Sequence, residues 1–303
     1  MNLDAAYAEC RAIAHKHGAN FSVGFRFLPR KKRRAVYAAY AFCRVADDIA
    51  DEEDVIPSDA KDLPPDVAPG DPSPSARLRM TRLAEWQREL EACYAGTPSH
   101  PITIALADAL RHFAIPKAAF VALIDGCRQD MTKTRYETFQ ELVQYCELVA
   151  TSISDISLAI FGYRAPSALD HGRNLAIALQ LTNVTRDIGD DLGRNRVYLP
   201  AEDLRRFGVQ EAELFARAEN DRVRALIEFQ ISRAERYFRE AEPLLRELDF
   251  DARFPTLLMG GVYATVLAKL RKDPLLAVRK RLSLSPLQKL LVVGTRVLRP
   301  HFV

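Results

Sequence analysis

Apolar residues recur at intervals of three and four along almost the whole chain, and strand-like alternation is hard to find. Glycine is sparse, at 13 of 303 residues, and a hydrophobic fraction of 48% is ample for a large core. This periodicity predicts an all-α fold, and Thr138 with Glu141 resembles a capping box that opens a helix from Leu142 to Phe161. The clearest runs are Val36, Tyr40, Cys43 and Ala46; Leu106, Leu110 and Phe113; Phe120, Leu123, Ile124 and Cys127; and Ile227, Ile231, Ala234 and Phe238.

One acidic stretch interrupts the helical pattern at about residues 52–75. Residues 52–74 contain six of the 17 prolines and seven acids against one base. Such a composition buries little apolar surface, and proline removes helix hydrogen bonds, so we expect a mobile surface loop. The segments on both sides have the same helical spacing of apolar residues, which indicates one domain that spans residues 1–303.

A basic C-terminal segment at about residues 269–303 offsets that loop. Residues 269–299 hold nine bases and one acid, so the net charge of +3 conceals two oppositely charged regions. The apolar residues after Ser283 would either bury as a final helix or lie on a bilayer. We expect this segment to make peripheral contact with an anionic membrane, so that deletion of residues 283–303 would weaken liposome binding.

Several function classes are excluded by motifs that the sequence lacks. The five cysteines are widely spaced with no CxxC pair, so neither a disulfide framework nor a zinc site is indicated. Walker loops, GxGxxG motifs and nucleophile triads are absent, and the small net charge argues against a nucleic-acid partner. The start resembles no targeting segment and no run of about 18 uncharged apolar residues occurs, so the expected location is cytoplasmic, with peripheral contact at the inner membrane surface.

The first constellation of chemical residues lies in residues 37–51, YAAYAFCRVADDIAD. On a helix, Asp47 and Asp51 are one turn apart on one face, with Asp48 on its flank. Clustered carboxylates repel unless a cation lies between them, and hard oxygens suit magnesium that shares its coordination with phosphates. A solvated helix end would look similar, but the surrounding apolar residues indicate a buried helix. One and two turns back lie Arg44 and Tyr40.

The second constellation lies in residues 180–200, QLTNVTRDIGDDLGRNRVYLP. Two amides and two carboxylates follow one another at intervals of three, four and four residues from Gln180 to Asp191. This spacing predicts a polar stripe along one face of an otherwise apolar helix. Such a stripe is costly unless a partner offsets its desolvation, and nearby arginines suit phosphate oxygens. The stripe is Gln180, Asn183, Asp187 and Asp191, and the arginines are Arg186, Arg194 and Arg196.

Two acidic stripes on separate helices imply one site between them. We infer that they face each other across a helical bundle and hold magnesium and a diphosphate ligand. Metal and arginine charge would stabilise the departing diphosphate, and an apolar bundle interior would shield the resulting carbocation from water.

Three segments carry a family resemblance: FSVGFRFLPRKKRRAVYAAYAFCRVADDIAD, DMTKTRYETFQELVQYCELVA and ALQLTNVTRDIGDDLGRNRVYLP. In this order they resemble the squalene/phytoene synthase family of head-to-head prenyl synthases, over about residues 10–282. The second and third are most similar to the bacterial presqualene diphosphate synthase and squalene synthase branch. The resemblance implies a helical bundle of the isoprenoid (terpenoid) synthase type with a central apolar cavity.

For function, the resemblance implies a transferase that condenses two prenyl diphosphates head to head. One donor ionises, its allylic cation alkylates the double bond of the second, proton loss closes a cyclopropane and pyrophosphate leaves. The main expectation is presqualene diphosphate, or squalene, from two farnesyl diphosphates; phytoene from geranylgeranyl diphosphate, and hydroxysqualene, are the alternatives. The implied cofactor is Mg²⁺, with Mn²⁺ as a substitute, and NADPH is needed only if the reaction proceeds to squalene.

A different functional class is an inactive relative that serves as an assembly or interaction protein. Retention of the four stripe aspartates and the arginines favours the enzyme. Prenyl diphosphates are then the expected partners, and the oligomeric state stays open.

Motif matches carry family roles onto individual residues, and the resemblance implies three groups. Metal contacts fall to Asp47, Asp48, Asp51, Asp187 and Asp191. Catalytic roles, in holding diphosphate or stabilising cations, fall to Tyr40, Arg44, Tyr145, Arg186 and Tyr263. Substrate contacts fall to Phe21 and Ser22 in an N-terminal flap, and to Gln180, Asn183, Arg196, Lys280 and Arg281.

The chain departs from the family pattern after Tyr145, where relatives carry a glycine pair. Residues 149–155, VATSISD, contain no glycine, although glycine permits close approach of backbone and substrate. The added bulk, and Asp155 in particular, leaves prenyl-chain length and product open but not the diphosphate chemistry.

Overall fold

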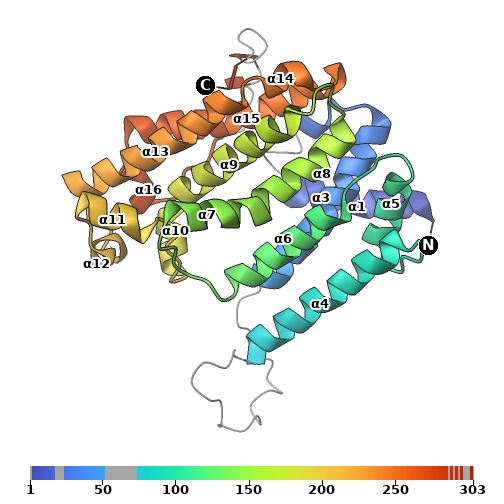
Figure 1. The fold of residues 1–303 in the computed structure, drawn as a ribbon, viewed down its shortest axis with the longest axis horizontal. Coiled ribbons are helices and arrows are strands. Elements are labelled where there is room, and N and C mark those ends of the chain that lie inside the picture. Colours follow the sequence, from blue (N-terminus) through green and yellow to red (C-terminus); the bar gives the residue numbers. More distant parts are fainter. Residues whose placement is uncertain are drawn as a thin grey trace.

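The computed structural model describes residues 2–17, 24–51, 74–285, 287–288, 291–292, 294–295 and 301–302. Within these ranges the chain is helical, apart from turns and two isolated β-bridges (Figure 1). The predicted all-α fold is therefore confirmed. Among these residues, no helix reaches the length and apolarity needed to cross a bilayer.

Parts of three sequence expectations lie outside the described residues. They are the flap residues Phe21 and Ser22, residues 52–73 of the acidic stretch, and most of residues 286–300. The end of the predicted loop is helical instead, because Pro74 and Ser75 already belong to a helix.

The helices follow one another through the chain with short connections. The first half comprises α1 (Leu3–His17), α3 (Arg30–Asp51), α4 (Pro74–Tyr94), α5 (Pro101–Leu110), α6 (Lys117–Asp130), α7 (Phe139–Cys146), the π-helical turn η2 (Glu147–Thr151) and α8 (Ser152–Phe161). The second half comprises α9 (Ala168–Arg186), α10 (Ile188–Gly193), α11 (Ala201–Phe207), α12 (Glu211–Phe215), α13 (Asp221–Ala241), α14 (Leu244–Glu247), α15 (Phe250–Lys272) and α16 (Leu276–Arg279).

Helix α8 lies between the two helices that carry the acidic motifs. α9 packs along α13 and also contacts α7, η2, α8 and α15, whereas α3 packs on α1, α4, α5, α6 and α8 (Figure 1). The middle of α3 is fixed by aromatic packing, because the ring of Phe42 stacks on Trp86 at 4.8 Å and meets the edge of Phe120 at 5.0 Å. Trp86 Nε1 donates to the Phe42 carbonyl at 3.1 Å. The prediction that this motif lies on a mostly buried helix is confirmed.

Two helices that the sequence predicts as continuous are interrupted. The predicted helix from Leu142 to Phe161 changes to π geometry over η2 before it resumes as α8. The polar stripe from Gln180 to Asp191 is divided at Asp187, whose backbone (φ −100°, ψ 9°) ends α9 and begins α10. Both interruptions occur where the sequence places chemical residues, and π turns are frequent at functional sites.

The described part of the C-terminal segment contains both buried and exposed apolar residues. Leu284, Val292 and Phe302 are buried, while Leu287 and Leu291 are exposed. The ring of Phe302 lies 6.3 Å from that of Phe238 and covers the bare backbone of Gly260, where a Cβ atom would clash with it. The backbone N–H of Phe302 donates to Glu242 Oε1 at 2.6 Å.

Candidate active site

The carboxylates at the end of α3 differ in their partners. Asp48 pairs with Arg44 one turn earlier, whereas Asp47 accepts a hydrogen bond from Cys127 Sγ at 3.5 Å. Burial raises the pKa of Asp47 to about 7, and the neighbouring acids Asp51 and Asp130 reinforce this against the opposing effect of Arg44. Asp47 is therefore a carboxylate whose charge is incompletely balanced by the described residues.

Asp130, at the end of α6, connects the two motifs, although the sequence reasoning did not single it out. It accepts hydrogen bonds from Tyr145 Oη at 2.7 Å and Tyr198 Oη at 2.9 Å. Arg196 donates to the Asp130 carbonyl at 3.1 Å and lies 3.7 Å from Asp51 Oδ1. A carboxylate at the end of an apolar helical run, within the quoted segment DMTKTRY, was the available signal.

The second acidic group is built around the interruption at Asp187. Both carboxylate oxygens of Asp187 accept from Arg186, at 2.7 and 2.6 Å, and Arg281 Nε lies 3.1 Å from Asp187 Oδ1. Burial raises the pKa of Asp191 to about 7; Asp187 adds to this effect, and Arg196 and Arg194 oppose it. Lys280 and Arg281 are both exposed, but of this predicted basic pair it is Arg281 whose side chain lies against Asp187.

Two tyrosines and two amides lie beside the arginines. Asn183 Nδ2 donates to Gln180 Oε1 at 3.2 Å. Burial raises the pKa of Tyr40 to about 12. Burial also raises the pKa of Tyr263, although Arg186 and Asn183 lower that pKa in part. Both tyrosines are therefore neutral hydrogen-bonding groups near pH 7.

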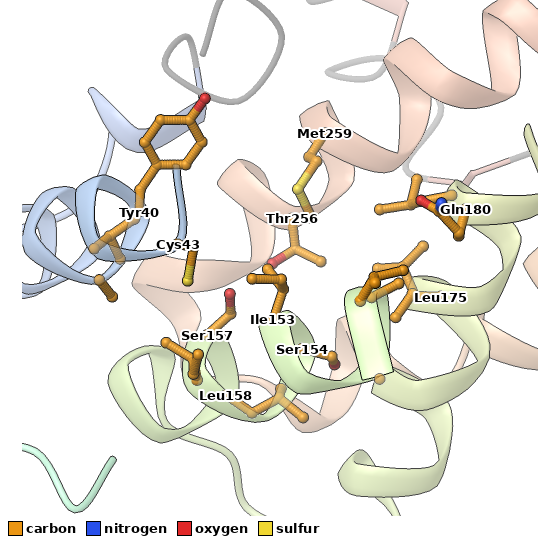
Figure 2. A pocket seen from close by; sticks show the side chains of 18 of the residues that line it. Tyr40, Cys43, Ile153, Ser154, Ser157, Leu158, Leu175, Gln180, Thr256 and Met259 are labelled. Carbon is orange, nitrogen blue, oxygen red and sulfur yellow. The ribbon is translucent and has the colours of Figure 1, made fainter. Parts of the chain in front are cut away.

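Several of these groups line a cavity of about 420 Å³. Figure 2 shows its wall built from four helices: Tyr40 and Cys43 from α3; Ile153, Ser154, Ser157 and Leu158 from α8; Leu175 and Gln180 from α9; and Thr256 and Met259 from α15. Two of its buried polar atoms, Arg44 Nε and Asn183 Oδ1, have no hydrogen-bond partner among the described residues. The polar lining comprises Tyr40, Arg44, Asp47, Gln180, Asn183, Arg186, Tyr263 and Arg281.

The squalene/phytoene synthase family model matches residues 14–288. The chain belongs to this family. Its members are prenyltransferases that join two prenyl diphosphates head to head and generally use Mg²⁺. The bundle with its central cavity is the isoprenoid synthase fold that the sequence resemblance implied.

Similar proteins within the family have two kinds of product. The 15-cis-phytoene synthase of Synechococcus elongatus is 32% identical over 98% of this chain and 94% of its own length, and the phytoene synthase of Mycobacterium tuberculosis is 34% identical over 95% and 89%. Among solved structures, a dehydrosqualene synthase complex has a TM-score of 0.85 at 26% identity, covering 99% of this chain and 98% of its own. Squalene synthase HpnC from Alicyclobacillus acidocaldarius has a TM-score of 0.78 at 30% identity, covering 89% and 95%.

The predicted site residues of this family member fall into three sets. Tyr40, Arg44, Asp47, Gln180, Asn183, Arg186, Tyr263 and Arg281 line the cavity. Asp48, Asp51, Tyr145, Asp187, Asp191 and Arg196 surround its polar part through the contacts above and do not belong to its lining. Lys280 is exposed and does not belong to the cavity lining, and Phe21 and Ser22 lie outside the described residues.

The carboxylates fit magnesium in their chemistry but form no closed cage. Throughout the described ranges, His, Cys, Asp and Glu do not gather in groups of three or more suited to a metal ion. Asp47 and Asp191 nevertheless each carry a pKa raised by burial and by other acids of the cluster. Mg²⁺ characteristically takes one or two carboxylates and completes its shell with water and substrate phosphates, so an open set of hard oxygens suits it.

The segment that lacks the family's glycines forms η2 and the start of α8. Val149, Ala150, Ile153 and Ser154 line the cavity, so their side chains limit its width at this wall. Burial raises the pKa of Asp155, which does not line the cavity. The expected added bulk therefore comes from Val149 and Ile153, not from Asp155.

Proposed function

We propose that this chain condenses two geranylgeranyl diphosphates head to head to form phytoene. The observation that carries this choice is the similarity, at 32% and 34% identity over 98% and 95% of the chain, to phytoene synthases of Synechococcus elongatus and Mycobacterium tuberculosis. These findings favour the alternative over the main sequence expectation of presqualene diphosphate. A farnesyl-based product remains the second candidate, supported by the 30% identity to squalene synthase HpnC.

The polar part of the cavity is suited to binding diphosphate. Arg44 Nε is a buried donor with no partner in the described part of the chain, and Arg186 and Arg281 add two more guanidinium groups to the lining of the same cavity. Arginine forks match phosphate oxygens geometrically and stay charged at every relevant pH. These side chains would orient the departing diphosphate and stabilise its charge.

Asp47, Asp51, Asp187 and Asp191 are the residues that would hold Mg²⁺, with Asp48 beside them. When bound, the metal would neutralise diphosphate oxygens and make diphosphate a better leaving group. Ion pairs would hold the guanidinium groups in place, because Asp48 pairs with Arg44, Asp51 with Arg196, and Asp187 with both Arg186 and Arg281.

The apolar walls would protect the carbocation, and neutral tyrosines would steer the proton. Ile153, Leu158 and Leu175 exclude water along the cavity. Because burial keeps Tyr40 and Tyr263 protonated near pH 7, neither is a strong base. Released pyrophosphate is then the base at hand, and the two hydroxyls would orient it.

Product analysis with single substrates tests the proposal. Purified protein with Mg²⁺ and geranylgeranyl diphosphate, without NADPH, should release pyrophosphate and form phytoene, and EDTA should abolish both. If farnesyl diphosphate releases pyrophosphate and geranylgeranyl diphosphate does not, the result would support the second candidate. Release from neither substrate would instead indicate an inactive family member that acts in assembly.

A further inference from the structure

Three phenylalanines, two of them exposed and Phe254 half-buried, form an aromatic patch where α3 and α15 begin. Phe250, the first residue of α15, is 80% exposed, and Phe27, just before α3, is 53% exposed. Phe254 lies one turn after Phe250 on the same helix face, and its ring meets the edge of Phe27 at 5.0 Å. Phe27, Phe250 and Phe254 are called the aromatic patch below.

Basic side chains surround the aromatic patch. Arg26, Arg30, Lys31 and Arg246 are exposed, and none of these four has an ion-pair partner among the described residues. The acids of this surface are occupied, since Lys32 Nζ lies 3.3 Å from Asp249 and 2.7 Å from Asp251. The four exposed cations are called the basic rim below, and they leave this surface positively charged.

Lys32 also fixes the patch to the fold. Besides its two aspartates it donates to the Phe161 carbonyl at 2.6 Å, so the start of α3, the end of α8 and the start of α15 are joined at one point. The helix ends that carry the aromatic patch are thus held together by tertiary contacts.

The aromatic patch adjoins residues that line the substrate cavity. Phe25, Leu248 and Thr256 line the cavity, and each is two residues from a member of the patch. Along α3, Asp47 lies 17 residues after Arg30, a helical rise of about 25 Å. The basic rim is therefore separate from the arginines that face the diphosphate site.

We propose that the aromatic patch and basic rim dock this enzyme on an anionic lipid bilayer. Amphipathic surfaces with aromatic side chains and surrounding lysine and arginine partition into the headgroup region of anionic membranes. A bilayer accommodates a small patch of three rings, whereas a protein partner would need a larger apolar surface. Docking here sets a wall of the cavity against the membrane that receives a hydrocarbon product, whichever prenyl diphosphate the enzyme uses.

Vesicle flotation tests this surface. Wild-type protein should bind phosphatidylcholine vesicles containing phosphatidylglycerol and should not bind phosphatidylcholine alone at about 0.1 M salt. The double variant Phe27→Ser with Phe250→Ser should bind the anionic vesicles about tenfold less tightly or worse. The control is Phe215→Ser at the end of α12, where the ring is 42% exposed, and it should bind as wild type does.

Charge variants give a second, independent readout. Arg30→Gln with Lys31→Gln should weaken binding about fivefold per charge removed. The matched control is Arg205→Gln with Arg206→Gln, two exposed consecutive arginines on α11, which should have no effect on binding. All variants should keep the wild-type melting temperature and turn over detergent-dispersed substrate at the wild-type rate.

Three results would overturn the proposal. One is wild-type protein that binds neither vesicle, which would indicate a protein partner or no docking at all, or that binds both equally, which would show that the basic rim does not direct docking. Another is a Phe27→Ser and Phe250→Ser variant that binds as wild type does. The third is a Leu287→Ser and Leu291→Ser variant that loses more binding than the aromatic variant, because the C-terminal segment would then be the docking surface.

Discussion

At the residue scale, the site is dominated by carboxylates whose charge the protein balances incompletely. Burial and neighbouring acids raise the pKa of Asp47 and Asp191 to about 7, while Arg44 pairs with Asp48 and Arg196 lies beside Asp51. A buried, uncompensated carboxylate costs free energy that a bound cation recovers. Asp47 and Asp191, whose buried charges lower the stability of the metal-free fold, are thus well suited to bind the metal.

This cost should appear as a pH dependence of stability in metal-free protein. The Asp47 carboxyl has a pKa of about 7 in the folded chain and an ordinary value of 3.8. The folded chain therefore binds more protons between these values, so the free energy of unfolding falls as pH rises from about 4 to about 7. In EDTA, Asp47→Asn should melt at a higher temperature than wild type at about pH 8, and the difference should shrink at about pH 5. A difference that is constant, or that grows on acidification, would show that Asp47 is not destabilised by its charge.

Activity should depend on Asp51 but not on the acid at position 190. Asp51→Asn keeps the size of the side chain and removes a metal-facing charge, so we expect kcat/KM to fall about 100-fold or more with little change in melting temperature. Asp190→Asn is the matched control, because Asp190 is exposed next to Asp191 and should stay within about twofold of wild type. Normal turnover by Asp51→Asn would refute the metal assignment.

At the element scale, periodicity predicted where helices lie but not where they break. Asp187 ends one helix and starts the next because its carboxylate is held by Arg186 and Arg281, and Arg281 is almost 100 residues away in sequence. The π turn η2 depends on packing against α6, another tertiary contact. Asp130 was missed for the same reason, since its partners Tyr145 and Tyr198 come from later segments.

Close contact between α6 and η2 gives a test of this packing. A Cβ atom at Gly126 would lie 2.5 Å from Val149 Cγ1, so Gly126→Ala should destabilise the protein by about 1–3 kcal/mol. Adding Val149→Ala removes the clashing atom and should recover part of the loss. Gly193→Ala is the control, because nothing lies within 4 Å of its Cβ position. Equal melting temperatures for Gly126→Ala and Gly193→Ala would show that the contact is loose.

At the scale of the whole molecule, the chain ends are part of the bundle. The sequence left open whether the C-terminal segment buries or lies on a membrane, and its described residues include both buried and exposed apolar side chains. Phe302 is fully buried against Phe238 and Gly260, whereas Leu287 and Leu291 are exposed. Amphipathic spacing alone predicts neither outcome, because the space that Phe302 fills is created by α13 and α15.

Removal of the Phe302 ring should therefore destabilise the fold. We expect Phe302→Ala to lower the free energy of unfolding by about 3–5 kcal/mol, measured by chemical denaturation. Leu291→Ala, at an exposed position of the same segment, should change it by less than about 0.5 kcal/mol. Equal stability of the two variants would mean that the chain end does not pack in the core. Deleting residues 283–303 would remove Phe302 as well, so point variants are the sounder test of membrane contact.

The central claim, a head-to-head prenyltransferase that uses geranylgeranyl diphosphate, is tested most directly by competition. Wild-type protein with Mg²⁺ and without NADPH is given an equimolar mixture of geranylgeranyl and farnesyl diphosphates, and products are identified by mass. Phytoene should exceed every farnesyl-derived product by about tenfold or more, a preference of about 1.4 kcal/mol in transition-state binding. A dominant farnesyl-derived product would contradict the claim, as would absence of any coupled product.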